Sequence, residues 1–217
     1  MKNVFRVIFD WAEVWALLIP LAVLVIRKPK AVWLKPVVSY LLIALALNLA
    51  VDVIWYGNQY KLFRINNNIF YNIHSLARFL LFAWFFHLIG KPFPRLNRFV
   101  PILFLLVLVV IYAFIDKNVV NINSKALALE SALLLGYCIV FYALLTQEDR
   151  TGSLTKFPAF WVVAGLSLFT AINFFIYLFF NYLAIANKDF SISIWDVHNF
   201  FYLVMCIFIA IAFRNER

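Results

Sequence analysis

Long apolar runs recur along the whole chain, and short polar segments that contain Lys, Arg, Asn or Pro separate them. About 20 apolar residues are the length that an α-helix needs to cross the hydrocarbon core of a bilayer. A helix satisfies its own backbone hydrogen bonds in lipid, and runs of this length are typical of helices rather than barrel strands. The pattern predicts an all-α membrane protein with seven transmembrane helices, at roughly 8–26, 36–56, 68–90, 99–115, 125–146, 158–182 and 192–213.

The composition agrees with this pattern. Of the 217 residues, 66% are hydrophobic and 13% are charged, and the mean hydropathy is +0.92. A soluble domain carries about 25% charged residues. No stretch is polar enough to form a separate soluble domain, so we expect residues 1–217 to form a single transmembrane domain in a lipid bilayer.

The Lys and Arg residues that produce the formal net charge of +9 fall almost entirely in the short loops. This placement is typical of membrane topology signals and argues against nucleic acid as a partner. Eleven cations lie on the side of the C-terminus and seven on the side of the N-terminus, so the positive-inside rule predicts the N-terminus outside and the C-terminus in the cytoplasm. The eleven are Arg27, Lys28, Lys30, Lys35, Lys91, Arg95, Arg98, Arg150, Lys156, Arg214 and Arg217.

Two short motifs suggest an internal repeat. "YNIHS" at 71–75 and "WDVHN" at 195–199 both read aromatic, polar, β-branched, His, polar. The pattern predicts a parallel 3+1+3 repeat with units 8–90 and 125–213 and a linker helix at 99–115. Chance agreement among apolar helices is the other interpretation, and both are open. The matched polar pairs are His74 with His198, Asn48 with Asn173, and Glu13 with Glu130.

Most polar residues inside the predicted spans fall in the outer third of the membrane, while Arg78 and Asn173 lie nearer the middle. Ionisable groups at the centre of a membrane helix cost about 2.5–3.5 kcal/mol and usually face the bundle interior or water. Several of them at one depth predict a polar cavity that opens to the outside and binds a small ligand or cation. The candidate ligand-binding residues are Asn48, Asp52, His74, Arg78, Glu130, Asn173, Asp196 and His198.

The charges of this set do not balance. Four acids face one permanent cation, Arg78, so the predicted cluster carries −3 when both histidines are neutral. Protonated carboxylates, charged histidines or a bound cation would relieve this excess. The purely structural alternative places Glu13 and Asp196 among the headgroups and pairs Arg78 with Asp52 as an internal brace. The four acids are Glu13, Asp52, Glu130 and Asp196.

Two histidines at one predicted depth, His74 and His198, raise the alternative of a membrane-embedded metal-dependent enzyme with Asp52 or Glu130 as further ligands. No HxxxH or HExxH motif occurs, so such ligands would have to converge from different helices. A single haem between the two histidines is a related alternative. The absence of a lysine from 192–213, where a Schiff base would form, argues strongly against a retinal pigment. No activated nucleophile is recognisable, so no catalytic residue and no cofactor is assigned.

Three segments carry a family resemblance: "IHSLARFLLFAWFF", "FPAFWVVAGLSLF" and "WDVHNFFYLVMCIFIAIAF". They resemble a group of small, uncharacterised bacterial seven-helix proteins that look like companions or input modules of sensor histidine kinases. The resemblance implies a multi-pass protein of the bacterial inner (cytoplasmic) membrane with a cytoplasmic signalling partner. A small-solute transporter of the three-helix-repeat type is the remaining alternative, and the oligomeric state is left open. The residues that match the family are His74, Trp161, Gly165, Trp195, His198 and Asn199.

Overall fold

The computed structural model describes residues 11–62, 65–89, 96–115, 122–147, 154–186 and 188–216, without the side chains of 96–97 and 181–193. These residues form helices and no strand, which confirms the predicted all-α class. Short turns η1 (Val32–Leu34) and η3 (Leu154–Lys156) precede α3 and α7, and a π-helical turn η2 (Ile111–Ile115) extends α5. The helices are α2 (Ala12–Arg27), α3 (Lys35–Gln59), α4 (Asn68–Leu88), α5 (Leu96–Val110), α6 (Ser124–Gln147), α7 (Pro158–Ala186) and α8 (Lys188–Asn215).

Six helical segments in the described part of the chain, one in each of α3 to α8, are long and apolar enough to cross a membrane. The chain is therefore a multi-pass membrane protein by length and composition. Their bounds agree with six of the predicted spans to within about one helical turn. The first predicted span, 8–26, begins outside the described residues, and its described part, α2, has 16 residues. The seventh span therefore stays a prediction.

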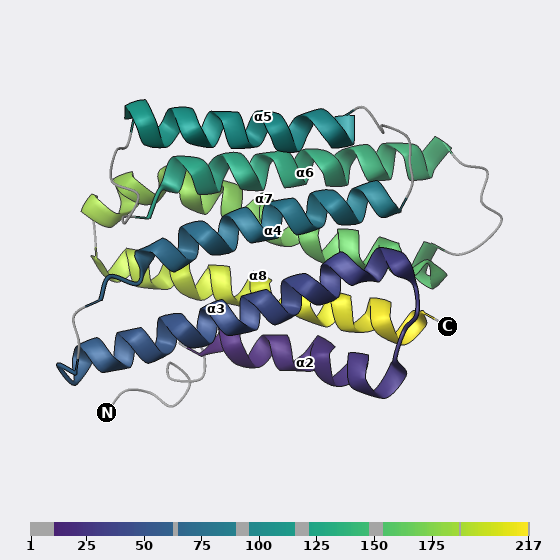
Figure 1. Ribbon diagram of the computed structural model, residues 1–217, viewed down its shortest axis with the longest axis horizontal. Coiled ribbons are helices and arrows are strands. Elements are labelled where there is room, and N and C mark those ends of the chain that lie inside the picture. Colours follow the sequence, from purple (N-terminus) through teal and green to yellow (C-terminus); the bar gives the residue numbers. More distant parts are fainter. Residues whose placement is uncertain are drawn as a thin grey trace.

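Consecutive helices run antiparallel, and six of them close a ring (Figure 1). Around this ring α2 contacts α3, α3 contacts α4, α4 contacts α6, α6 contacts α7, α7 contacts α8, and α8 returns to α2. The helix α5 lies outside the ring against α4. Since α2, α4, α6 and α8 are parallel, their first turns lie at the same end of the bundle, toward the left in Figure 1.

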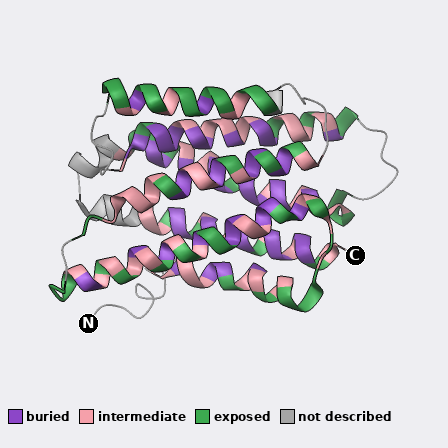
Figure 2. Ribbon diagram, viewed as in Figure 1, coloured by how far each residue is buried: buried purple, intermediate pink, exposed green. Residues whose placement is uncertain are grey.

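The outer surface is apolar, as expected of helices that face lipid. Exposed residues cover much of α5 (Figure 2), where Ile102, Leu103, Leu106 and Val109 are each more than half exposed. The interior is also apolar and rich in aromatic rings, but it is closely packed. Residues of this core with no exposed surface include Leu17, Tyr40, Phe79, Phe82, Phe85, Leu134, Phe169, Met205 and Phe213.

A glycine lets α7 and α8 approach closely. A Cβ atom at Gly165 of α7 would lie 2.8 Å from Cβ of Phe208 and 3.1 Å from Cα of Met205, both on α8. Small residues let membrane helices approach in this way and gain van der Waals contact. The tight α7–α8 pair holds Asn173 of α7 beside His198 of α8, which belong to the candidate site.

Candidate functional site

A layer of polar side chains crosses the ring near the end where α2, α4, α6 and α8 begin. Glu13 lies in the first turn of α2, and Glu130 lies in the second turn of α6. Ser75 and Arg78 lie further along α4, and His198 lies in α8. Parallel helices that begin at one end bring these residues to one layer of the bundle. The sequence predicted a common depth for Glu13, Glu130 and His198, but it placed Arg78 nearer the middle of its span. Two bridges join their side chains.

The first bridge connects α4 to α6. The Arg78 guanidinium donates from Nε to Oε1 of Glu130 at 2.7 Å and from Nη2 to Oε2 at 2.6 Å. Ser75 donates its hydroxyl to Oε2 at 3.0 Å, and the Phe169 ring centroid lies 5.0 Å from the guanidinium carbon. Both charged side chains are buried, at 3% and 0% exposure. This bidentate geometry is the strongest form of an ion pair. The alternative in which Arg78 pairs with Asp52 is therefore wrong.

The second bridge connects α2 to α8 and is less complete. Oε1 of Glu13 lies 3.3 Å from Nε2 of His198, close enough for an ion pair. The atoms are not aligned as a hydrogen bond, and Oε1 has no hydrogen-bond partner among the described residues. On the other side of the imidazole, Nδ1 of His198 contacts Oδ1 of Asn173. The Tyr177 hydroxyl also lies 3.4 Å from this Nδ1. The indole of Trp195 stacks on the imidazole, with centroids 4.8 Å apart.

A small cavity lies between the two bridges. It measures about 10 Å³, which is roughly the room that one water molecule needs. Nε2 of His74 and the Tyr202 hydroxyl, from residues on its wall, are buried without a hydrogen-bond partner in the described part of the chain. The polar layer is therefore almost closed, whereas the sequence predicted an open outward-facing cavity. The wall consists of Glu13, Tyr71, His74, Ser75, Arg78, Leu127, Tyr177, His198 and Tyr202.

Six of the eight predicted site residues belong to this layer. His74, Arg78 and His198 line the cavity, and Glu130 and Asn173 bind two of them. Asn48 is buried in α3 and donates its amide to the backbone oxygen of Glu13 at 2.8 Å. The two remaining residues, Asp52 and Asp196, are half-buried and do not line the cavity.

The sequence-based list of site residues omits part of the layer. Glu13 was noted only as a repeat match and as one of the acids, yet it forms half of the second bridge. Tyr177 follows Asn173 by one helical turn, and that spacing could have indicated it. Nothing in the sequence pattern indicated Ser75 and Tyr202 as site residues, because serine and tyrosine are common in apolar helices.

The described residues contain no group of three or more His, Cys, Asp or Glu side chains that could hold a metal ion. His74 and His198 do line one cavity, but His74 stacks on Tyr40 with centroids 5.8 Å apart. The metal-dependent alternative therefore has no ligand set in this part of the chain.

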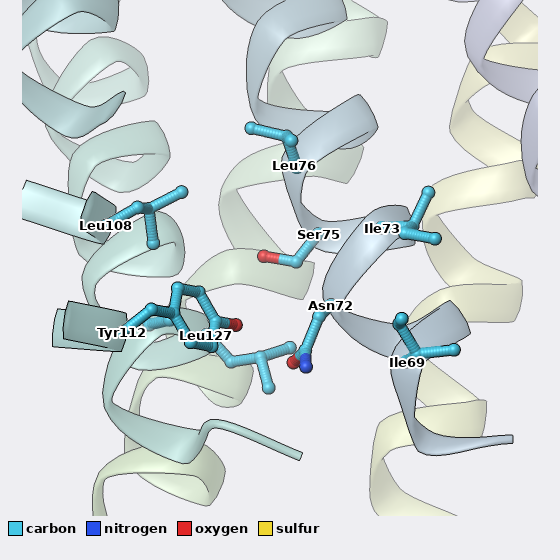
Figure 3. A pocket seen from close by; sticks show the side chains of 9 residues that line it. Ile69, Asn72, Ile73, Ser75, Leu76, Leu108, Tyr112 and Leu127 are labelled. Atoms are coloured by element: carbon cyan, nitrogen blue, oxygen red, sulfur yellow. The ribbon is translucent and has the colours of Figure 1, made fainter. Parts of the chain in front are cut away.

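A second, larger cavity lies beside the first bridge (Figure 3). It measures about 190 Å³ and lies between α4, α5 and α6. Ile69, Leu76, Leu108 and Leu127 give it an apolar wall, and Figure 3 shows that Leu108 and Leu127 point into it. Ser75 lines both cavities, so its hydroxyl lies between the apolar space and Glu130.

Comparison with known protein families, with curated proteins and with solved structures finds no match for this chain. The resemblance to small bacterial seven-helix proteins therefore stays a prediction.

Proposed function

We propose that this protein is a sensory or accessory module of the bacterial inner membrane that binds a small ligand or cation in the polar layer. It passes the signal to a cytoplasmic partner. The observation that carries the proposal is the pair of polar bridges around one small cavity. Buried ionisable groups in membrane helices are costly, and they are typically kept for function.

The proposed topology has seven spans with the N-terminus outside. The helix α2 is 16 residues long, or about 24 Å, and the sequence before it stays largely apolar back to residue 8. Arg27, Lys28, Lys30 and Lys35 are all exposed at the end where α2 meets α3. These cations favour the cytoplasm for that end. Reporter fusions to the α2–α3 and α3–α4 connections test this orientation.

The order of helices in the ring favours the proposed 3+1+3 repeat. A half-turn that exchanges units 8–90 and 125–213 would exchange α2 with α6, α3 with α7, and α4 with α8. It would also exchange the two bridges, because each joins the first helix of one unit to the third helix of the other. The peripheral α5 would be the linker. The repeat predicts that His74 superposes on His198.

The proposed signal runs along α2. Glu13 lies at one end of this helix in the polar layer, and the exposed cations Arg27 and Lys28 lie at the other. Pro20 lies inside α2 between these ends and is buried. A proline removes one helical hydrogen bond and allows a local bend. A ligand that binds one state of the Glu13–His198 bridge better shifts the population of α2 positions.

Hydrogen–deuterium exchange in lipid nanodiscs tests the sensory role. We expect a change of pH or of cation to alter the protection factors of residues 27–35, which correct for the intrinsic pH dependence of amide exchange, and Glu13→Gln to abolish that response. Asp52→Asn is the matched control, since Asp52 lies outside the cavity wall. Protection factors at 27–35 that stay constant under every condition would count against the proposal. Flux of protons or small cations through proteoliposomes would instead favour the transporter alternative.

A further inference from the structure

The side-chain amide of Asn173 determines which nitrogen of His198 carries a proton. Nδ2 of Asn173 donates to the backbone oxygen of Phe169 at 2.7 Å. A carbonyl oxygen only accepts, so this contact orients the amide and leaves Oδ1 facing the imidazole. An amide oxygen also only accepts. The hydrogen-bond network therefore assigns a hydrogen to Nδ1 of His198.

With this assignment, no proton lies between His198 and Glu13 in the second bridge when the imidazole is neutral. A neutral imidazole carries a single N–H, so Nε2 of His198 then presents a lone pair. Nε2 lies 3.3 Å from the carboxylate oxygen Oε1 of Glu13, although the two atoms are not aligned as in a hydrogen bond. Two acceptor atoms this close in a largely buried space repel each other unless a proton lies between them. The side chains are 6% and 16% exposed, so solvent supplies little relief.

The geometry points to a proton-binding site between α2 and α8, in which Glu13 and His198 together hold one proton and Asn173 is the positioning residue. The proton resides on Nε2 of His198, as imidazolium beside the Glu13 carboxylate. This form replaces the repulsion between two acceptors with an attraction between opposite charges.

The groups around the pair favour a single proton. Arg78 of α4 and Glu130 of α6 neutralise each other, so the fixed charges of the layer sum to zero before Glu13 is counted. With one shared proton the Glu13–His198 pair is also neutral, and without it the layer carries −1. A buried uncompensated charge is strongly unfavourable.

Every helix packed around the pair supplies a group to this environment. The hydroxyl of Tyr177 on α7 is a neutral neighbour, and so is the imidazole of His74 on α4, whose Nε2 has no hydrogen-bond partner among the described residues. Asn48 of α3 binds the backbone of Glu13. Asp52 of α3 and Asp196 of α8 are half-buried acids outside the cavity wall, and their negative charge favours a proton on the pair.

The site has a direct mechanical consequence. Loss of the proton sets the Nε2 lone pair of His198 against the Glu13 carboxylate and loosens the contact between α2 and α8. That this proton is the sensed ligand rests on the proposed function, whereas the proton site rests on the geometry alone.

Nitrogen-15 NMR of the histidine side chains, in full-length protein in nanodiscs, tests the site directly. The His198→Gln variant identifies the His198 signals. We expect Nδ1 of His198 to carry a proton at every pH, and Nε2 to gain one as pH falls. Glu13→Gln should lower the affinity of Nε2 for this second proton about tenfold or more, since the substitution removes the neighbouring negative charge. Asp52→Asn is the matched control and should change the proton affinity of Nε2 less than Glu13→Gln does.

Two results would overturn the proton site. One is a neutral His198 in the wild-type protein with its hydrogen on Nε2, which needs no variant to detect. The other is a folded Glu13→Gln variant with unchanged protonation of Nε2. A confirmed proton site together with pH-independent protection factors at residues 27–35 would support the site and reject its sensory role.

Discussion

The two polar bridges occupy equivalent places in the ring but differ in how completely they are formed. Arg78 and Glu130 are both buried, both charged and joined by two aligned hydrogen bonds. Glu13 and His198 approach to 3.3 Å without alignment, and their pairing depends on a proton. A permanent cation gives a bridge that pH leaves unchanged, while a histidine gives one that can open. We infer that the first bridge is a brace and the second a switch.

The largest expected loss of unfolding free energy comes from breaking the brace. Glu130→Leu leaves the Arg78 guanidinium buried without its partner, and removing one member of a buried ion pair costs about 3–5 kcal/mol. The free energy of unfolding in detergent should fall by that order. The double variant Arg78→Met with Glu130→Leu should recover much of the loss, because it removes both charges. A single variant as stable as the wild type would contradict the brace.

Breaking the switch should have a smaller effect that depends on pH. Glu13→Gln removes the anion beside the protonated His198, and the tenfold loss of proton affinity expected above corresponds to about 1.4 kcal/mol. The loss should appear at low pH, where the wild-type bridge is formed, and should disappear at high pH. Unfolding measured across this pH range checks the sign. A loss of equal size at every pH would mean that the bridge is a second brace.

A still smaller loss of unfolding free energy is expected from a substitution at Ser75, which adds one hydrogen bond to the Arg78–Glu130 brace. Its hydroxyl donates to Oε2 of Glu130 at 3.0 Å. Ser75→Ala removes one hydrogen bond to a carboxylate that keeps both bonds from Arg78, so we expect a loss of about 1 kcal/mol. Ser75→Thr, which keeps the hydroxyl, is the control. A cost as large as that of Glu130→Leu would contradict the leading role of Arg78.

The smallest effect is expected at the acids outside both bridges. Asp52 and Asp196 are half-buried and do not line the polar cavity. Asp52→Asn and Asp196→Asn should change the free energy of unfolding by no more than about 0.5 kcal/mol, the usual range for sites away from buried networks. A large destabilisation by either variant would add that acid to the layer and change its charge balance.

The helices and the depth of the polar layer could be predicted from the sequence. Apolar runs report span positions because lipid excludes unpaired backbone groups, and His74, Arg78, Glu130 and His198 stood out as ionisable groups inside such runs. Depth along a helix is a local property, so counting residues from the end of each run sufficed for His74, Glu130 and His198, although the same count placed Arg78 nearer the middle.

The partners of the charged side chains and the size of the polar cavity could not be predicted, because both depend on which helices are neighbours. Arg78 is bound by Glu130 rather than Asp52 because α4 contacts α6 at this depth. Glu13 reaches His198 because α2 closes the ring against α8. Tyr71, Tyr177 and Tyr202 fill the space that the sequence suggested would be open.

The distance across each bridge as pH rises is the most direct test of the difference between brace and switch. Spin labels at the exposed positions Leu18 of α2 and Phe200 of α8 report the second bridge, and labels at Trp84 of α4 and Ile139 of α6 report the first. We predict that the α2–α8 distance distribution lengthens or broadens at high pH, while the α4–α6 distribution stays constant. Two distributions that change together, or an α2–α8 distance independent of pH, would contradict the account.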